Sequence, residues 1–160
     1  MMFNVGDRIV YPLHGAGIVE SIEHHEVLGK NQSYYVLRLL MDKIRIMVPT
    51  SSVEKVKLRG VISGGEVSKV IEILRKKDDE INYISDWKTR YANNLEKMKS
   101  GCIYKIAEVV KNLSSRHKKH GLSSIEKRLF DNALSMIVSE VSFAKDIDIK
   151  ESIAMIEEIL

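Results

Sequence analysis

The chain has 160 residues, of which 44% are hydrophobic and 29% are charged, and its net charge is +3. This length is about that of one ordinary domain or two small ones, which excludes a large enzyme, and the composition excludes a disordered chain. No apolar stretch approaches the roughly 18 residues that a membrane-spanning helix needs, and an acidic residue interrupts the first apolar run, which argues against a signal peptide. We therefore expect a cytoplasmic protein that makes no contact with a membrane.

The first 60 residues have the pattern of strands joined by short turns. The four segments with this pattern are 5–12, 17–24, 32–40 and 43–49. Alternate side chains of a strand point to opposite faces, so Ile44, Ile46 and Val48 are predicted to face the core. A fifth short strand is predicted at 53–58. Strands at this spacing favour a small antiparallel β-barrel of Tudor or SH3-like type, whose usual role is to present a face or an edge strand to a partner.

After about residue 64 the apolar period becomes that of a helix. The segments with helical spacing are 67–74, 91–98, 103–113, 129–137 and 153–160. They predict about five helices, and Ser123 and Asp148 each precede a glutamate by three residues, which is the spacing of a capping box. The predicted fold class is therefore α+β in two domains, with a β domain at 1–60 and an all-helical domain at 64–160.

Charge is unevenly distributed over the predicted helical domain. Residues 97–128 contain nine Lys or Arg but only two acids, Glu108 and Glu126. Residues 129–160 reverse this balance, with two lysines and seven acids. The basic block indicates a face for a polyanion such as a nucleic-acid backbone, although a solvated helix face would give the same count, and both interpretations stay open.

The patterns that could indicate an enzyme are weak. The Gly-x-Gly within 14–19 lacks a third glycine and lies in a predicted hairpin, which disfavours a nucleotide site. His24 and His25 would point to opposite faces of a strand, so surface histidines are favoured over metal ligands. Cys102, the only cysteine, excludes an internal disulfide and has no acid-base partner that the sequence identifies. We expect a protein that is not an enzyme and needs no metal or cofactor.

Trp87 is the only tryptophan, and it begins the second predicted helix beside Lys88 and Arg90. A tryptophan is commonly a core or interdomain anchor, because burying the indole is strongly favourable. The backbone N–H groups of a helix N-terminus, however, favour phosphate. A planar apolar wedge flanked by cations also suits a protein that inserts a side chain at a base step in the minor groove.

Four stretches together resemble a known protein family more specifically than any single residue does. They are FNVGDRIVYPLHGAGIVESIE at 3–23, VPTSSVEKVKLRGVIS at 48–63, WKTRYANNLEKMKSGCIYKIAEVVKNL at 87–113 and GLSSIEKRLFDNALSMIVSEV at 121–141. In order and spacing they resemble the CarD/CdnL family of bacterial transcription regulators. The resemblance covers nearly the whole chain, and its most specific motifs are VGDRIVYPxHGxG and W-x-x-R-Y-x-x-N-x-E-K.

The resemblance implies a specific function. By this resemblance, the N-terminal domain of the chain would be Tudor-like, similar to that of the transcription-repair coupling factor, and would bind the β subunit of bacterial RNA polymerase. Its helical domain would reach double-stranded promoter DNA near the −10 element, at the upstream edge of the melted bubble, where Trp87 would act as a minor-groove wedge that stabilises the open complex. The residues expected at DNA are Trp87, Lys88, Arg90, Tyr91, Lys127 and Arg128. Those expected at the polymerase are His25, Arg45, Ile46, Met47 and Val48.

Three positions depart from the family pattern. Ala92 stands where family members can carry a cation, and Met47 and His25 stand where they can carry arginine. The polar detail of the polymerase contact is therefore expected to differ, whereas edge-strand pairing uses backbone groups and is independent of these side chains. We expect a monomer that is associated with the nucleoid through RNA polymerase.

Two other functions stay open. The chain could be a protein adaptor in which Trp87 is buried between the two domains. It could also be an RNA-binding module, although the β half lacks the aromatic motif that RNA-binding sheets carry.

Overall fold

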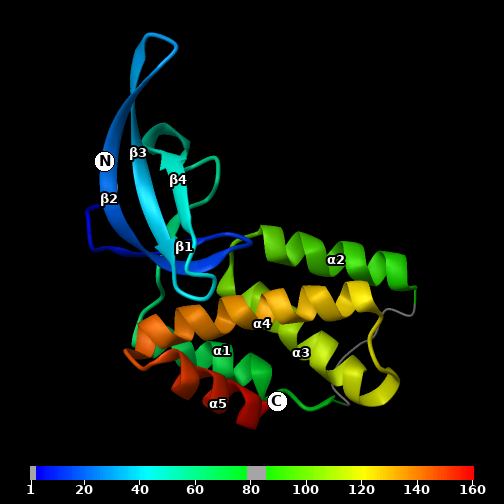
Figure 1. The fold of residues 1–160 in the computed structure, drawn as a ribbon. Helices are drawn as coiled ribbons and strands as arrows, with labels where there is room; N and C mark the ends of the chain where they lie inside the picture. The colour runs from blue at the N-terminus through cyan, green and yellow to red at the C-terminus, as the bar shows by residue number, and fades with distance from the viewer. Residues whose placement is uncertain (1–2, 79–85) are drawn as a thin grey trace.

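The computed structural model describes residues 3–78 and 86–160. Figure 1 shows a β domain that stands on one side of a group of helices. The strands are β1 (Arg8–Tyr11), β2 (Gly15–Val27), β3 (Lys30–Leu39), β4 (Arg45–Pro49) and β5 (Arg59–Gly60). They form one antiparallel sheet in the order β4-β3-β2-β1-β5, so that β4 and β5 are its edges.

The β domain has its own small core, as the alternating apolar pattern predicts. Its buried members are Ile9, Val19, Tyr35, Leu37, Val48, Val53 and Leu58. The β2–β3 hairpin is longer than predicted, and Figure 1 shows its end reaching well beyond β4. The orientation predicted for Ile44 is wrong, because that side chain is 46% exposed and β4 begins only at the next residue.

The fifth strand lies later than the sequence pattern indicates. Residues 53–58 follow a short 3-10 helix, η1 (Thr50–Ser52), and form turns, so the strand predicted there is wrong. Lys57 has a φ of +58°, which interrupts an extended backbone, and the Leu58 amide bonds back to the carbonyl oxygen of Val53 at 3.0 Å. The strand forms just afterwards, where Gly60 pairs with Ile9 of β1.

The five predicted helices are confirmed. They are α1 (Val67–Leu74), α2 (Trp87–Lys99), α3 (Ile103–His120), α4 (Ser124–Lys145) and α5 (Ile149–Ile159). The predicted caps are also present, because the side chains of Ser123 and Asp148 accept hydrogen bonds from the backbone N–H groups three residues later. The apolar stripes meet in one core that includes Val70, Met98, Ile106 and Ile137, all fully buried. Among the described residues, no helix has the length and apolar character to cross a membrane.

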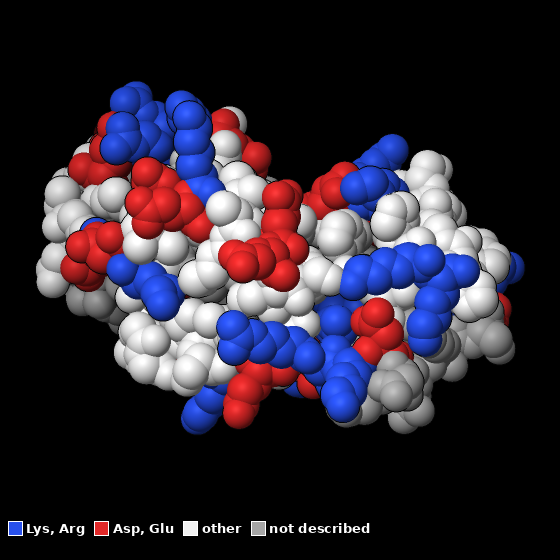
Figure 2. All heavy atoms as spheres, turned by 90° about the horizontal axis from the view of Figure 1, so that it is seen from below, with Lys and Arg blue, Asp and Glu red and all other residues white. Residues whose placement is uncertain are grey.

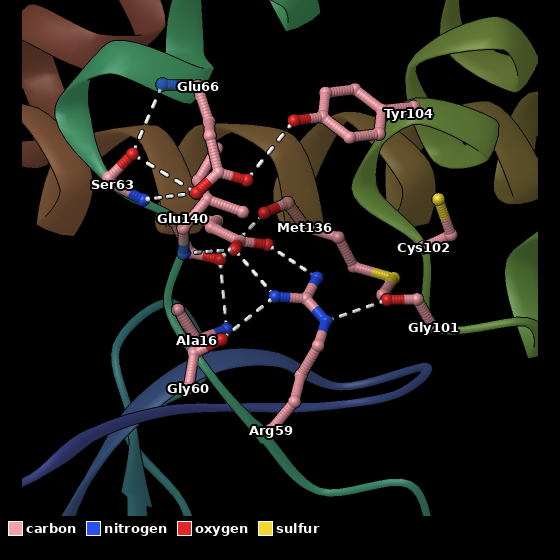
Figure 3. Close-up of polar contacts among 12 residues, drawn as sticks. Ala16, Arg59, Gly60, Ser63, Glu66, Gly101, Cys102, Tyr104, Met136 and Glu140 are labelled. Atoms are coloured by element: carbon pink, nitrogen blue, oxygen red, sulfur yellow. Dashed lines mark hydrogen bonds and ion pairs between the residues drawn. The ribbon is translucent and has the colours of Figure 1, made fainter.

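A buried ion pair joins the two domains. Arg59 of β5 donates two hydrogen bonds of 2.7 Å to the carboxylate of Glu140 in α4, which is 1% exposed (Figure 3). Glu140 also accepts from the Ile62 backbone at 2.9 Å, and the Nε of Arg59 donates to the carbonyl oxygen of Gly101 at 2.8 Å. Because bidentate charge-assisted bonds fix orientation as well as distance, this junction sets how the β domain stands on the helices.

Candidate nucleic-acid interface

Trp87 occupies the first turn of α2 and is 49% exposed. The residue before it, Asp86, has extended backbone and begins the helix, and its carboxylate accepts a 2.7 Å hydrogen bond from the Thr89 hydroxyl. That bond, together with backbone N–H groups and the Arg90 charge, lowers the pKa of Asp86. The first turn is therefore well ordered while the indole remains accessible.

Arg90, one turn further along α2, points inward. Its Nε and Nη2 donate to the two carboxylate oxygens of Glu126 at 2.8 Å each, and the side chains are 8% and 4% exposed. This contact lowers the pKa of Glu126 and raises that of Arg90, although burial opposes both shifts. Because Glu126 lies in the first turn of α4, the pair fixes the start of α2 against the start of α4.

A hollow of about 570 Å³ lies beside Trp87. Its other walls come from the end of α3, the loop after it and the first turn of α4, including Arg116, Leu122 and Ile125. Ile125 is 47% exposed, so Trp87 and Ile125 present apolar surface on the same side of the helical domain. Every described residue that lines this hollow belongs to the helical domain.

The remaining residues expected at DNA take different positions. Lys88, Lys127 and Arg128 are exposed, and Tyr91 is half-buried against the helical core. Lys127 donates to Asp131 at 2.9 Å, and its ammonium lies 5.4 Å from the centre of the Phe130 ring. Four of the six side chains expected to contact DNA, Trp87 among them, therefore lie at the surface. Arg90 and Tyr91 lie beneath it.

Both acids of the basic block are engaged with cations. Glu108 pairs with Lys97 at 3.0 Å, and Glu126 pairs with Arg90. Figure 2 shows Lys and Arg side chains, with few acidic ones among them, on the right-hand half of the face seen from below. In Figure 1 this half holds the first turns of α2 and α4. On this face, Lys and Arg therefore outnumber acidic residues at the end of the molecule where α2 and α4 begin.

The residues expected at the polymerase lie mainly on the edge strand β4. Arg45 and Met47 are exposed, Ile46 is half-buried and Val48 is 2% exposed, which is the alternation of a half-buried strand. Met47 is opposite Val36 of β3, so the other side of β4 has no strand beside it in the described sheet. Arg45 pairs with Glu20 at 2.9 Å.

His25 lies apart from β4. It is on β2, two strands away, in the part of the hairpin that extends past the end of β4, where it is opposite Gln32. Its ring contacts Glu23 at 3.3 Å and packs edge-on against Tyr34. The structure does not bring His25 together with the four β4 residues.

No metal-binding cluster is present among the described residues: no three His, Cys, Asp or Glu side chains lie close enough to hold an ion. His24 bonds to the Ser33 hydroxyl at 2.7 Å. Cys102 is half-buried at the start of α3, where its backbone N–H donates to the Ser100 hydroxyl at 3.1 Å.

Sequence reasoning missed Ile125 and Glu126 as parts of the site. Ile125 lies four residues before Leu129, so helical spacing alone places it on the buried stripe. Glu126 looks like a capping glutamate, and only the fold brings it to Arg90. No signal in the sequence pairs the two, because Glu126 lies 36 residues after Arg90.

Comparison with known proteins gives the following matches. The family description "CarD-like/TRCF RID domain" matches residues 3–62, and "CarD, C-terminal domain" matches residues 69–157. The Bacillus subtilis (strain 168) protein named "Putative transcription factor YdeB" is 38% identical over 150 residues, which cover 94% of this chain and 97% of that protein.

Two solved structures match the N-terminal part. "CdnLNt" from Myxococcus xanthus is 51% identical and covers 39% of this chain and 89% of its own, with a TM-score of 0.34. The solution NMR structure of the 72-residue N-terminal domain of Myxococcus xanthus CarD is 34% identical and covers 36% and 77%, with a TM-score of 0.32. These TM-scores are too low to support an argument about the fold.

Proposed function

The chain belongs to the CarD family, and we propose that it is a bacterial transcription regulator that binds RNA polymerase and promoter DNA at the same time. The β domain would hold the β subunit of the polymerase, and the helical domain would contact the upstream edge of the melted bubble near the −10 element. Trp87 would act there as a minor-groove wedge that slows collapse of the open complex. No step of this function requires catalysis by the protein.

The observation that carries the proposal is the exposure of Trp87. A tryptophan used only for packing is highly buried, whereas this indole is 49% exposed beside the exposed Ile125. Apolar wedges flanked by cations are the usual means of entering a minor groove, and Lys88, Lys127 and Arg128 are exposed in the first turns of the same two helices. The buried Arg90 supports this surface by holding the two helices together.

The size of the expected effect is consistent with such a role. Stacking of a base on an aromatic ring is worth about 1–3 kcal/mol, which corresponds to a roughly tenfold to hundredfold shift in an equilibrium. This contribution requires no sequence readout, which suits a regulator that the polymerase itself delivers to promoters.

The edge strand β4 supports the polymerase contact. An edge strand can pair with a strand of a partner through its free backbone groups, and side chains at alternate positions then add specificity. Met47, which is 46% exposed, would supply an apolar contact where family members can carry arginine.

The adaptor alternative, with Trp87 as an interdomain anchor, receives less support. In the part of the chain that the structure describes, the residues around the Trp87 hollow come from the helical domain, and Arg59 and Glu140 join the two domains elsewhere.

The wedge is tested by the lifetime of promoter open complexes formed by bacterial RNA polymerase. The wild-type protein should lengthen this lifetime, Trp87→Ala should lose most of the effect, and Trp87→Phe should keep part of it because a smaller ring remains. A lifetime that the wild type leaves unchanged, although polymerase binding is intact, would make the adaptor the better interpretation.

A matched pair of substitutions tests the proposed polymerase contact and the proposed DNA contact independently. Met47 and Ile125 are equally exposed apolar residues on different domains, at 46% and 47%. Met47→Glu should weaken binding to the isolated β subunit in a pull-down, whereas Ile125→Glu should leave that binding intact and shorten the open-complex lifetime. The reverse pattern would contradict the assignment of the two surfaces.

A further inference from the structure

A second hollow, of about 550 Å³, lies at the junction of the β domain with α2 and α3. Lys57 of the β domain forms one wall, and α3 contributes Lys105 and Asn112. The remaining wall comes from α2 and its end, with Arg90, Asn93, Asn94, Glu96, Lys97, Lys99 and Ser100. Each of the described residues that line it has a polar or charged side chain. The volume is that of a small-molecule site, but the apolar part of its lining comes from the stems of polar and charged side chains of the described residues, which distinguishes it from most such sites.

The hollow is strongly positive. Two of its cations, Arg90 and Lys97, have acidic partners on α4 and α3. The other three, Lys57, Lys99 and Lys105, are exposed, and the described residues include no acidic group paired with any of them. Among the described residues, one glutamate is the only acid in the lining. Clustered lysines around a concavity attract anions, because the low-dielectric walls concentrate the field.

Asn94 adds a neutral hydrogen-bond donor to the lining of the hollow. Its side chain lines the hollow, no hydrogen bond joins it to any residue in the ranges 3–78 and 86–160, and its amide atoms are accessible rather than fully buried. An amide that is open to a concavity can donate to a bound oxygen without first breaking a protein–protein hydrogen bond. A ligand oxygen in the hollow would accept a hydrogen bond from this amide.

The position of Lys57 makes the site dependent on both domains. Its backbone lies in the left-handed region, at a φ of +58°, where a residue other than glycine costs roughly 1–2 kcal/mol. It precedes by two residues Arg59, which fixes the β domain to α4 and to the end of α2. The same junction that orients the domains therefore places Lys57 opposite Lys99 and Asn94.

We propose that this hollow binds a compact polyphosphate, either free or as the phosphate chain of a nucleotide. Phosphate oxygens would lie among Lys57, Lys99 and Lys105 and accept a hydrogen bond from Asn94, and several negative charges in a small volume match the three lysines. No aromatic side chain of the described residues lines the hollow, so a nucleobase would find no ring on which to stack. Recognition is therefore centred on the phosphates.

The proposal is tested by isothermal titration calorimetry of the full chain with sodium tripolyphosphate, pyrophosphate, orthophosphate and adenosine triphosphate. Tripolyphosphate should bind more tightly than orthophosphate, and adenosine triphosphate should match tripolyphosphate if the base adds nothing. Failure of tripolyphosphate to bind would overturn the proposal. Much tighter binding of adenosine triphosphate would overturn recognition through the phosphates alone.

Two variants and a matched control locate the site. The double variant Lys99→Glu with Lys105→Glu should weaken tripolyphosphate binding by about tenfold or more, since tenfold corresponds to only 1.4 kcal/mol. Asn94→Leu, which removes the amide at similar volume, should also weaken binding without lowering the unfolding temperature. Lys76→Glu with Lys77→Glu makes the same charge change on exposed lysines after α1 and should have little effect. An equal loss in this control would show non-specific attraction and refute the site.

A duplex DNA of about 15 base pairs distinguishes the site from the proposed DNA surface. Tripolyphosphate at saturation should leave duplex binding unchanged apart from its contribution to ionic strength, which a matched sulfate solution reproduces. Displacement of the duplex beyond the sulfate control would assign these lysines to the DNA backbone and overturn the proposal, without affecting the role of Trp87.

Discussion

The buried pair of Arg90 and Glu126 gives the sharpest test of how Trp87 is held. Two hydrogen bonds of 2.8 Å join side chains that are 8% and 4% exposed. Glu126→Ala would leave the buried guanidinium without its carboxylate, and removing one partner of a buried pair costs about 3–5 kcal/mol. We expect a loss of about 3 kcal/mol, at the lower end of that range, because the hollow beside the pair admits water.

The assay is urea denaturation followed by circular dichroism and by the fluorescence of the single tryptophan. With a slope of about 2 kcal/mol per molar urea, the midpoint should fall by about 1.5 M. The control Lys127→Ala breaks an exposed pair with Asp131 and should cost at most about 1 kcal/mol. Arg90→Met combined with Glu126→Leu removes both charges at similar volume and should recover most of the loss.

The pair also predicts the direction of a pH effect. The hydrogen bonds from Arg90 lower the pKa of Glu126 in the folded protein, so the unfolded chain binds this proton more readily. The resulting stability is present above the ordinary glutamate pKa of about 4.3 and is lost as the pH falls through the lower folded value. Glu126→Gln should therefore lose less stability than the wild type between about pH 5 and 3. Equal losses, or a cost below about 1 kcal/mol for Glu126→Ala, would refute the stabilising role.

Two further predictions concern the β domain and its junction. Glu140→Gln keeps the shape that Arg59 contacts but removes the charge, so the thermal midpoint should fall by about 4–8 °C for a loss of roughly 2 kcal/mol; an unchanged midpoint would contradict this. Gly17→Ala would place a Cβ 2.5 Å from the Arg38 carbonyl oxygen and should cost about 2 kcal/mol in denaturation. The control Gly60→Ala meets nothing within 4 Å and should be near neutral, so equal costs for the two would exclude this contact as the cause.

The elements with long periodic signals were predictable from the sequence. Each helix has three or more apolar residues at helical spacing, and Ser123 and Asp148 provide local start signals, so the five helices appear where expected. The position of β5 was not predictable in the same way. Val53 and Leu58 are apolar and buried, but they pack from turns, and burial alone does not distinguish a turn from a strand.

The site was predictable only in part, because exposure depends on tertiary packing. The sequence places Trp87 at a helix start among cations, and the structure has it there with half of its surface accessible. The sequence predicts the same exposed position for Arg90, because a residue three positions after Trp87 lies on the same side of a helix. Which of the two faces inward is decided by Glu126, which is 36 residues further along the chain.

Helix α4 connects the two parts of the molecule mechanically. It carries two buried carboxylates, Glu126 and Glu140, and each fixes an arginine from another element: Arg90 of α2 and Arg59 of the β domain. The two glutamates are 14 residues apart, which at 1.5 Å per residue is about 21 Å along the helix, and a little under four turns separates them. An α-helix held at both points by bidentate bonds resists bending and rotation. A partner bound at β4 would therefore place Trp87 at a fixed distance and direction, and a wedge requires that placement in order to meet one base step.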